Sequence, residues 1–363
     1  MEVGSDGSAP DRTPPLRGLG VVRCDGDQVG HGGDDDHGGD DGGNRGDRGR
    51  GRDLPADQET PEAARLGCAA GSVATHVVDD RSSRRLRRAL GDGELHVHFQ
   101  PVVALATSTV VGFEALLRWQ RPGRGLLAPA DFLADVQAAG LMAPVGRCVL
   151  EAAVAVIAEL RGSRRARPDS DTTASDTTAS DTASLTIAVN IGSDQLAVPG
   201  LADAVLSLLA ARVLPGRALV LEIPETTVIT DFDVAATELG RLRAAGVGIC
   251  LDDYGTGRSG LHRLLELPFS SLKLDHTLTG QLGSDPRIGA VVTSTAALAD
   301  DLGLALVVEG VETPEQHRIL LASGYTHGQG WLFGHAVPPE QLPALLAGRP
   351  PAHGRWHPSQ GLR

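Results

Sequence analysis

The stretch Val247-Gly-Ile-Cys-Leu-Asp252-Asp253 indicates the fold most directly, because a short aliphatic run ends there in two adjacent carboxylates. Four other segments repeat this plan of an apolar run that ends in an acid or an amide: Val110–Glu114, Leu185–Asn190, Ala218–Glu222 and Leu304–Glu309. Helix-like segments separate the runs, and strands that alternate with helices are typical of a parallel sheet. We therefore predict an α/β fold, a (β/α)8 TIM-like barrel.

The start of the predicted barrel is irregular. His96–Val103 and Thr109–Trp119 are expected to be two strands joined by a short turn, so the first strand is predicted to run antiparallel to the second. Further along, apolar periodicity predicts helices at about 129–140, 143–161, 198–212, 231–245, 259–267, 286–302 and 313–322.

Polar residues at the ends of the strands would share one mouth of such a barrel, where catalytic groups gather. Crowded carboxylates repel one another unless a cation lies among them, which favours a divalent metal with oxygen ligands, Mg²⁺ or Mn²⁺. Each residue also has a simpler interpretation: Glu114 and Glu222 as solvated strand ends, Asn190 as a helix cap, and Asp252-Asp253 as a capped loop. Their repetition at successive strand ends favours a common site.

Composition narrows the class of protein. The 363 residues are 41% hydrophobic but only 3% aromatic, so aliphatic side chains must fill the core. The formal charge of −13 argues against DNA binding through a basic face, although it allows a small anionic substrate held by metal. The chain has neither an apolar run of ~18 residues nor a signal-like start, so we expect a cytoplasmic protein with no membrane partner. Its four scattered cysteines suggest neither a disulfide framework nor a zinc site.

Composition also divides the chain. Residues 1–60 are expected to be a disordered tail rich in Gly, Asp and Arg, and 61–83 a linker or the remnant of a module. The barrel is expected at 84–347, interrupted at 162–184 by a flexible insertion that contains a Ser-Asp-Thr repeat, and 348–363 is expected to be a loose tail.

Several motifs occur in order along the predicted barrel. They are Phe99-Gln-Pro101, Glu114-Ala-Leu-Leu-Arg118, Val189-Asn-Ile191, Leu221-Glu-Ile-Pro-Glu225, Asp252-Asp-Tyr-Gly-Thr-Gly257, Leu272-Lys-Leu-Asp275, Val308-Glu-Gly-Val-Glu-Thr313 and Gln329-Gly-Trp-Leu-Phe-Gly334. In these motifs the chain resembles the EAL domains, the phosphodiesterases that hydrolyse cyclic diguanylate (c-di-GMP) to linear pGpG. The resemblance covers about 260 residues, and several motifs in order are far more specific than any one of them.

The resemblance implies a two-metal site whose ligands are Glu114, Asn190, Glu222, Asp252, Asp253 and Glu309. Asp252 would bridge the two ions, and Glu309 would support the second metal or its water. Two nearby metals would activate a water and stabilise both the attacking and the leaving oxygen of a phosphodiester.

Further roles follow from the resemblance. Lys273, protonated among the acids, would hold the attacking water, and Gln329 would orient the water network. Gln100, Arg118 and Gln329 are assigned to substrate binding. Glu225 and the loop 254–259 would form a lid that couples dimerisation to metal binding, so Lys273, Glu309 and Glu225 are assigned to catalysis and a homodimer through the barrel is expected.

The lid departs from the family pattern, because Arg258 and Gly260 replace an aromatic residue and a serine. Two rival functions therefore stay open: a c-di-GMP receptor that has lost turnover, and a protein-interaction module that binds no nucleotide. Complete predicted ligands argue against the first, and absence of c-di-GMP binding would favour the second.

Overall fold

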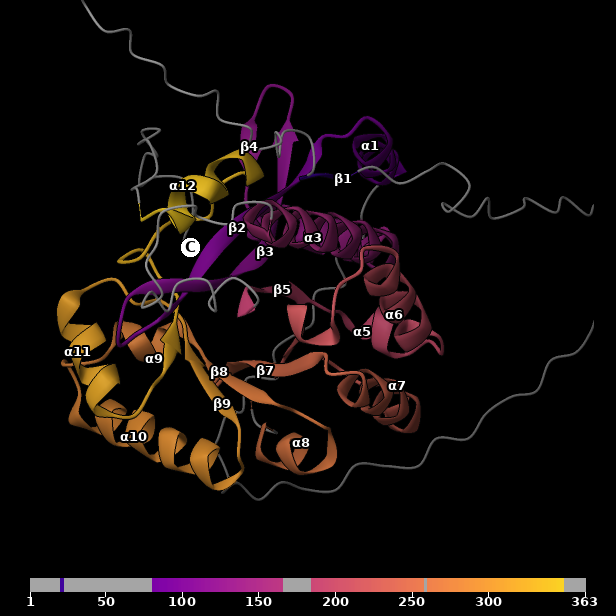
Figure 1. The fold of residues 1–363 in the computed structure, drawn as a ribbon. Coiled ribbons are helices and arrows are strands. Elements are labelled where there is room, and N and C mark those ends of the chain that lie inside the picture. The colour runs from indigo at the N-terminus through magenta and orange to yellow at the C-terminus, as the bar shows by residue number, and fades with distance from the viewer. Residues whose placement is uncertain (1–19, 23–79, 166–183, 258–259, 349–363) are drawn as a thin grey trace, which may run out of the picture.

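The computed structural model describes residues 20–22, 80–165, 184–257 and 260–348 (Figure 1). Its strands are β1 (Val21–Val22), β2 (Leu95–Ala104), β3 (Thr109–Arg121), β4 (Gly125–Leu127), β5 (Thr186–Asn190), β6 (Leu219–Pro224), β7 (Gly248–Tyr254), β8 (Ser271–Leu274), β9 (Ala305–Val308) and β10 (His327–Gly328). Its α-helices are α1 (Asp80–Gly91), α2 (Leu133–Ala138), α3 (Met142–Arg165), α5 (Ser193–Leu196), α6 (Leu201–Ala211), α7 (Phe232–Ala244), α8 (Gly260–Glu266), α9 (His276–Gly280), α10 (Pro286–Asp301), α11 (Pro314–Ala322) and α12 (Leu342–Leu346).

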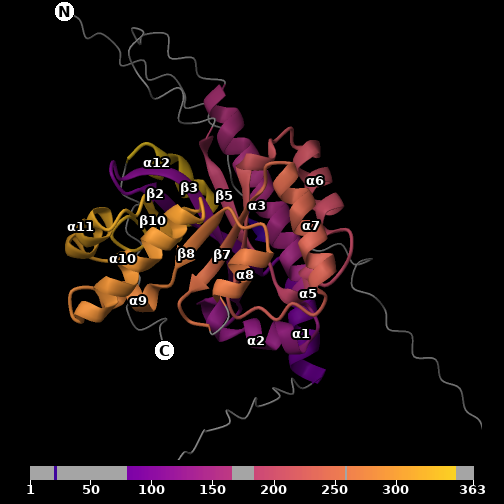
Figure 2. The ribbon, with the colours of Figure 1, turned by 90° about the horizontal axis from the view of Figure 1, so that it is seen from below.

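The strands close into a ring in the order β2, β10, β9, β8, β7, β6, β5, β3, and β3 pairs again with β2. The strand β2 runs antiparallel to both β3 and β10, whereas the other pairs in the ring are parallel. The strands β1 and β4 extend the sheet outside the ring, beside β2 and β3. Figure 2 shows α3, α6 and α7 on one side of the strands and α10 and α11 on the other. The predicted TIM-like barrel with an antiparallel first strand is confirmed.

Strand alternation separates the core from the barrel interior. On β6, Leu221 and Ile223 are buried in the hydrophobic core, and Glu222 between them points to the opposite face of the strand. The registers β5–β6 and β6–β7 place Asn190 beside Glu222, and Pro224 beside Asp252. The polar ends of these strands therefore meet at one mouth.

Local signals in the sequence place the helix starts close to their predicted positions. Asp231 caps α7 by accepting a 3.0 Å hydrogen bond from the Val234 amide. At α11, Thr313 caps the Gln316 amide while the Gln316 side chain returns to the Thr313 amide, which is a capping box. The predicted helix at 129–140 is shorter, because a 3₁₀ turn at Pro129–Asp131 precedes α2.

Three boundaries differ from the expectation. Val21–Val22, inside the segment predicted to be disordered, pair with β2 as β1. The helix α1 begins at Asp80, within the predicted linker, and α3 continues to Arg165, within the predicted insertion. The rest of the tails, most of the insertion and Arg258 of the lid lie outside the described residues.

The cysteines correct a second expectation. Cys148 in α3 is disulfide-bonded, although the spacing of the cysteines suggests no disulfide framework. Cys250 is a buried free thiol on β7. In the described part of the chain, none of the helices combines the length and the apolarity needed to span a membrane.

Candidate active site at the barrel mouth

Carboxylates from separate strands converge at the barrel mouth in two groups. Glu114, Glu222 and Asp252 offer oxygens within 4.8 Å of one another, and all three side chains are buried. Asp252, Asp253 and Glu309 form a second group by the same measure. Asp252 belongs to both groups.

Lys273 from β8 lies at the centre of this cluster and is 1% exposed. Its Nζ lies 2.7 Å from Glu309 Oε1 and 3.1 Å from Glu114 Oε2. Two further carboxylates are slightly more distant, with Glu222 Oε1 at 3.2 Å and Asp252 Oδ1 at 3.4 Å. It is the only lysine among the 33 basic residues of the chain. A compact ammonium, rather than a planar guanidinium, can approach four carboxylates at once.

Two side-chain amides donate hydrogen bonds to Glu114 and Glu309. Asn190 Nδ2 donates to Glu114 Oε1 at 3.2 Å, and Gln329 Nε2 donates both to Glu114 Oε2 and, at 3.0 Å, to Glu309 Oε1. The structure therefore brings together every predicted metal ligand except Asp253 through direct contacts with one another or with Lys273. Asp253 joins them through its amide, which donates to Asp252 Oδ1 at 2.9 Å.

The pKa values in the cluster reflect burial and mutual repulsion. Burial raises the pKa of Glu222 well above its ordinary value, and the neighbouring carboxylates add to the effect although Lys273 opposes it. Burial likewise raises the pKa of Glu309 to about 8 and that of Asp253 to about 6. Burial also favours a raised pKa for Glu114, but Lys273 and the amide hydrogen bonds lower it below the usual value.

Lys273 keeps its proton in these surroundings. Burial by itself would lower the pKa of an ammonium, but the four carboxylates raise the pKa of Lys273 well above its ordinary value. The residue is therefore a hydrogen-bond donor and a fixed positive charge, as the sequence predicts.

The donor set fits a divalent cation. It consists of oxygen atoms, the ligands that hard cations prefer. Glu222 Oε2 and Gln329 Oε1 are buried without a hydrogen-bond partner among the described residues. Five carboxylates face a single ammonium, so the cluster retains negative charge that further cations would neutralise.

Glu225 fixes the loop that follows the double aspartate. Its Oε2 accepts hydrogen bonds from the amides of Gly255 at 3.0 Å and Gly257 at 2.9 Å. A Cβ at position 257 would lie 2.6 Å from Glu225 Oε1, so the contact requires glycine. Asp253 has φ = 55°, a left-handed conformation that a non-glycine residue adopts at some energetic cost and that is often found at functional sites.

Gln100 and Arg118 lie on the same face of the β2–β3 hairpin as Glu114. Gln100 is the register partner of Glu114, and Arg118 follows Glu114 by four residues along β3. Gln100 Nε2 donates to the Gly334 carbonyl at 3.4 Å and Arg118 Nη1 to the Leu117 carbonyl at 2.8 Å. Neither side chain is hydrogen-bonded to the acid cluster in the described residues, although both lie on the strand face that carries Glu114.

The structure adds two residues that the sequence analysis had not assigned. Asp275 and His276 form a third group with Glu309, and His276 Nδ1 is 2.9 Å from Asp275 Oδ2. Asp275 also caps α9 through the Thr277 amide at 2.9 Å. The predicted motif Leu272–Asp275 contained the acid, but only the fold brings it beside Glu309.

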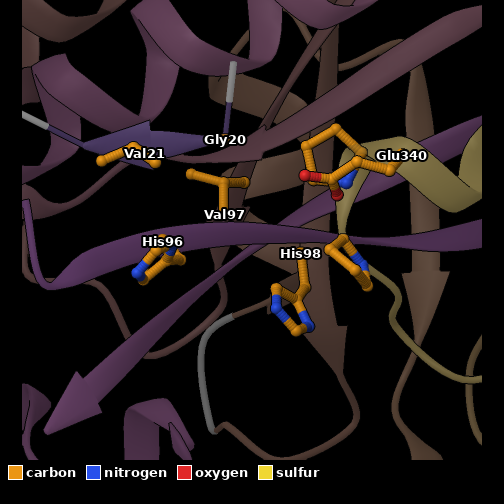
Figure 3. Close-up of a pocket in the computed structure, with 8 residues that line it drawn as sticks. Gly20, Val21, His96, Val97, His98 and Glu340 are labelled. Carbon is orange, nitrogen blue, oxygen red and sulfur yellow. The ribbon is translucent and has the colours of Figure 1, made fainter. Parts of the chain in front are cut away.

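A small hollow elsewhere is separate from this cluster. It lies between β1, β2 and the turn before α12, where Val97 and Glu340 face Gly20 and Val21 (Figure 3). No member of the acid cluster lines it, so it is not part of the candidate active site.

Comparisons with known proteins identify the family of the chain. The family model of the EAL domain matches residues 83–336, and the chain belongs to the EAL domain family. It is 38% identical over 262 residues to the bifunctional diguanylate cyclase/cyclic di-GMP phosphodiesterase MucR of Pseudomonas aeruginosa. The matched residues make up 72% of this chain and 36% of MucR. It is 34% identical to the cyclic di-GMP phosphodiesterase RocR of the same organism, over 70% of this chain and 60% of RocR.

The solved structure of the PaMucR phosphodiesterase in complex with c-di-GMP is similar to the barrel. The TM-score is 0.62 at 37% identity, over 72% of this chain and 99% of that one. The chain spans less than half the length of the first curated relatives that it matches, at 36%, 29% and 40%.

Proposed function

We propose that this chain is a metal-dependent phosphodiesterase that hydrolyses c-di-GMP to linear pGpG. The single observation that carries the proposal is the pair of carboxylate groups that share Asp252 around Lys273. The named activities of MucR and RocR support the choice of substrate.

Glu114, Asn190, Glu222 and Asp252 would hold one divalent ion, Mg²⁺ or Mn²⁺. Asp252, Asp253 and Glu309 would hold a second. Ions bound there would activate water for attack and neutralise charge on the phosphodiester. Calcium, being larger and taking more ligands, is expected to inhibit.

The protein side chains would position the reactants. The protonated Lys273 would donate hydrogen bonds to the attacking water or to a phosphate oxygen, since it has three N–H donors and keeps its charge. Arg118 has no ion-pair partner among the described residues, so its guanidinium is available to bind a substrate phosphate. Gln100 would contact the same substrate from β2. Gln329 would hold water through its carbonyl oxygen, which has no hydrogen-bond partner in the described part of the chain.

Glu225 would act through the loop and not on the reacting atoms. By holding the amides of Gly255 and Gly257, it would keep Asp253 in its left-handed conformation beside the metals. It is therefore better described as a positioning residue than as a catalytic one.

The same loop leads into a surface that suits a second copy of the chain. Leu261 and Leu265, one turn apart on α8, are 59% and 74% exposed, and Val228 in the loop after β6 is 67% exposed. Arg263 of α8 donates to the Thr227 carbonyl, which ties the two segments together. A homodimer through this surface would link the association of two chains to the position of the loop after Asp253. Leu265→Asp should then lower both the molecular mass measured by light scattering and the turnover of substrate.

Product analysis tests the proposed activity. Purified protein is incubated with c-di-GMP and Mg²⁺ or Mn²⁺, and pGpG is separated chromatographically; Asp252→Asn serves as the inactive control. We expect pGpG from the wild type and none from Asp252→Asn, because an amide bridges metals poorly. Binding of c-di-GMP without hydrolysis in either metal would favour the receptor function, and absence of binding would favour the protein-interaction module.

A further inference from the structure

A large groove on the outside of the barrel is rich in arginine. It has a volume of about 820 Å³, which is the size of small-molecule sites, and it lies between α1, the end of β3 and α2. Its lining includes Arg84, Arg85 and Arg88 of α1 and Arg121 of β3. Asp135 is the one acid in the lining among the described residues, so the groove is basic in a chain with a formal charge of −13.

Hydrogen bonds and ring contacts hold the floor of this arginine groove together. Trp119 is 2% exposed, and its Nε1 donates to Glu94 Oε2 at 2.9 Å. The guanidinium of Arg85 donates to both oxygens of Glu94, at 2.8 and 2.6 Å. The Arg121 guanidinium carbon lies 4.9 Å from the centre of the Trp119 ring, and Phe132 packs edge-on against the same ring. Because the Arg121 guanidinium is already held against the Trp119 ring, it loses little conformational freedom when it binds a ligand.

Arg88 and Arg121 are the cations above this floor on which binding of a ligand would depend. Arg88 is exposed, and neither Arg88 nor Arg121 forms a salt bridge within the described ranges, although the charge of Arg121 also acts on Glu94. Arg84 lies one helical turn from Arg88, which places the two side chains on one face of α1, about 5–6 Å apart at Cβ. Several guanidinium groups facing one groove match a ligand with adjacent phosphate groups, because each can donate two parallel hydrogen bonds to a phosphate.

The groove is distinct from the catalytic mouth, although β3 contributes to both. Glu114 and Arg118 lie on one face of β3, whereas Trp119 and Arg121 alternate onto the other. A ligand in the groove would therefore contact none of the acid cluster.

We propose that the arginine groove is a second binding site, which takes a small ligand with a diphosphate group. Arg88 and Arg121 bind the phosphate oxygens, Arg84 adds to the charge, and Arg85 and Trp119 form the floor. The proposal does not depend on the phosphodiesterase activity.

Calorimetric titration of the purified full chain with inorganic pyrophosphate tests the proposal. EDTA is present, so that metal cannot carry the probe into the catalytic mouth, where carboxylates alone repel it. We expect saturable binding to the wild type and a dissociation constant at least tenfold higher for Arg88→Gln and for Arg121→Gln. Arg87→Gln is the matched control, because Arg87 is exposed on the same helix but does not line the groove; its affinity should stay within twofold of the wild type.

Two results would overturn the proposal. One is the absence of saturable binding to the wild type. The other is an equal loss of affinity in Arg87→Gln and Arg88→Gln, which would mean that the anion is attracted to the helix without a defined site. Melting temperatures of all three variants show whether each is folded, and Arg88, being exposed, is the substitution least able to disturb the fold.

Discussion

Replacing Lys273 by methionine should destabilise the metal-free protein and strengthen its binding of metal. The ammonium lies 2.7–3.4 Å from four carboxylate oxygens, and methionine has similar volume without the charge. Removal of one partner from a buried ion pair costs roughly 3–5 kcal/mol, and uptake of protons by the remaining acids offsets part of that cost. We expect the free energy of unfolding to fall by about 3 kcal/mol, which corresponds to roughly 6–12 °C in melting temperature for a domain of this size.

The loss should depend on pH with a definite sign. Burial already raises the pKa of Glu309 from 4.5 to about 8, and loss of the ammonium would raise the pKa of the acids further. A carboxyl with a raised pKa binds more protons in the folded than in the unfolded state, so stability falls as pH rises between these two values. The deficit of Lys273→Met relative to the wild type should therefore be large at pH 8 and small at pH 5.5.

Urea denaturation in EDTA at these two pH values measures the deficit, and calorimetry with Mn²⁺ measures the affinity. Arg87→Met is the matched control, since it removes an exposed cation and should change stability by less than about 0.5 kcal/mol. The variant should bind Mn²⁺ more tightly than the wild type, because the ion no longer competes with the ammonium, yet it should not turn over substrate. Equal stability of Lys273→Met and the wild type at pH 8 would refute this reasoning.

Three further perturbations test other parts of the site. Gly257→Ala should lower turnover at least tenfold, because its Cβ would collide with Glu225, whereas Gly240→Ala in α7 meets nothing within 4 Å and should keep full activity and gain about 0.5–1 kcal/mol of stability by urea denaturation. Burial, assisted by the charge of Arg118, lowers the pKa of His98 from 6.5 to about 4, so between these pH values the unfolded state binds a proton that the folded state does not. Acidification through this window should therefore lower the free energy of unfolding of the wild type by up to about 3 kcal/mol. Urea denaturation of His98→Gln should lack this contribution. Lys273→Arg should also lose pGpG formation despite keeping the charge, because a planar guanidinium cannot approach four carboxylates in the space of an ammonium; wild-type turnover in this variant would show that charge alone suffices.

The sequence predicts the barrel well where strand and helix signals are both strong. The runs that end at Glu114, Asn190, Glu222 and Asp252 all lie in strands, because each is a short aliphatic segment that the fold buries. The strand β10 has only two residues, His327–Gly328, and carries no apolar run that could reveal it. It is held by pairing with β2 and β9, which the local sequence does not encode.

The candidate site was predictable as a set of residues but not as a geometry. Motif order placed Lys273 among the acids, whereas the four simultaneous contacts depend on how the ring closes. His276 was missed because a single histidine after a strand carries no spacing signal, and only the end of β9 brings Glu309 beside it. The sequence did not predict the arginine groove for a similar reason. The sequence of α1 alone is typical of a solvated basic helix, and only the tertiary fold brings Arg121 beside that helix.

A count of bound Mn²⁺ tests the central claim, a mouth that holds two divalent ions through a shared Asp252. Equilibrium dialysis of EDTA-stripped protein against Mn²⁺, with metal analysis of the protein compartment, gives the number of ions per chain. We predict two for the wild type and fewer than one at the same Mn²⁺ concentration for Asp252→Asn, which loses the carboxylate common to both groups. Absence of bound Mn²⁺ in the wild type, or an unchanged count in Asp252→Asn, would contradict the assignment.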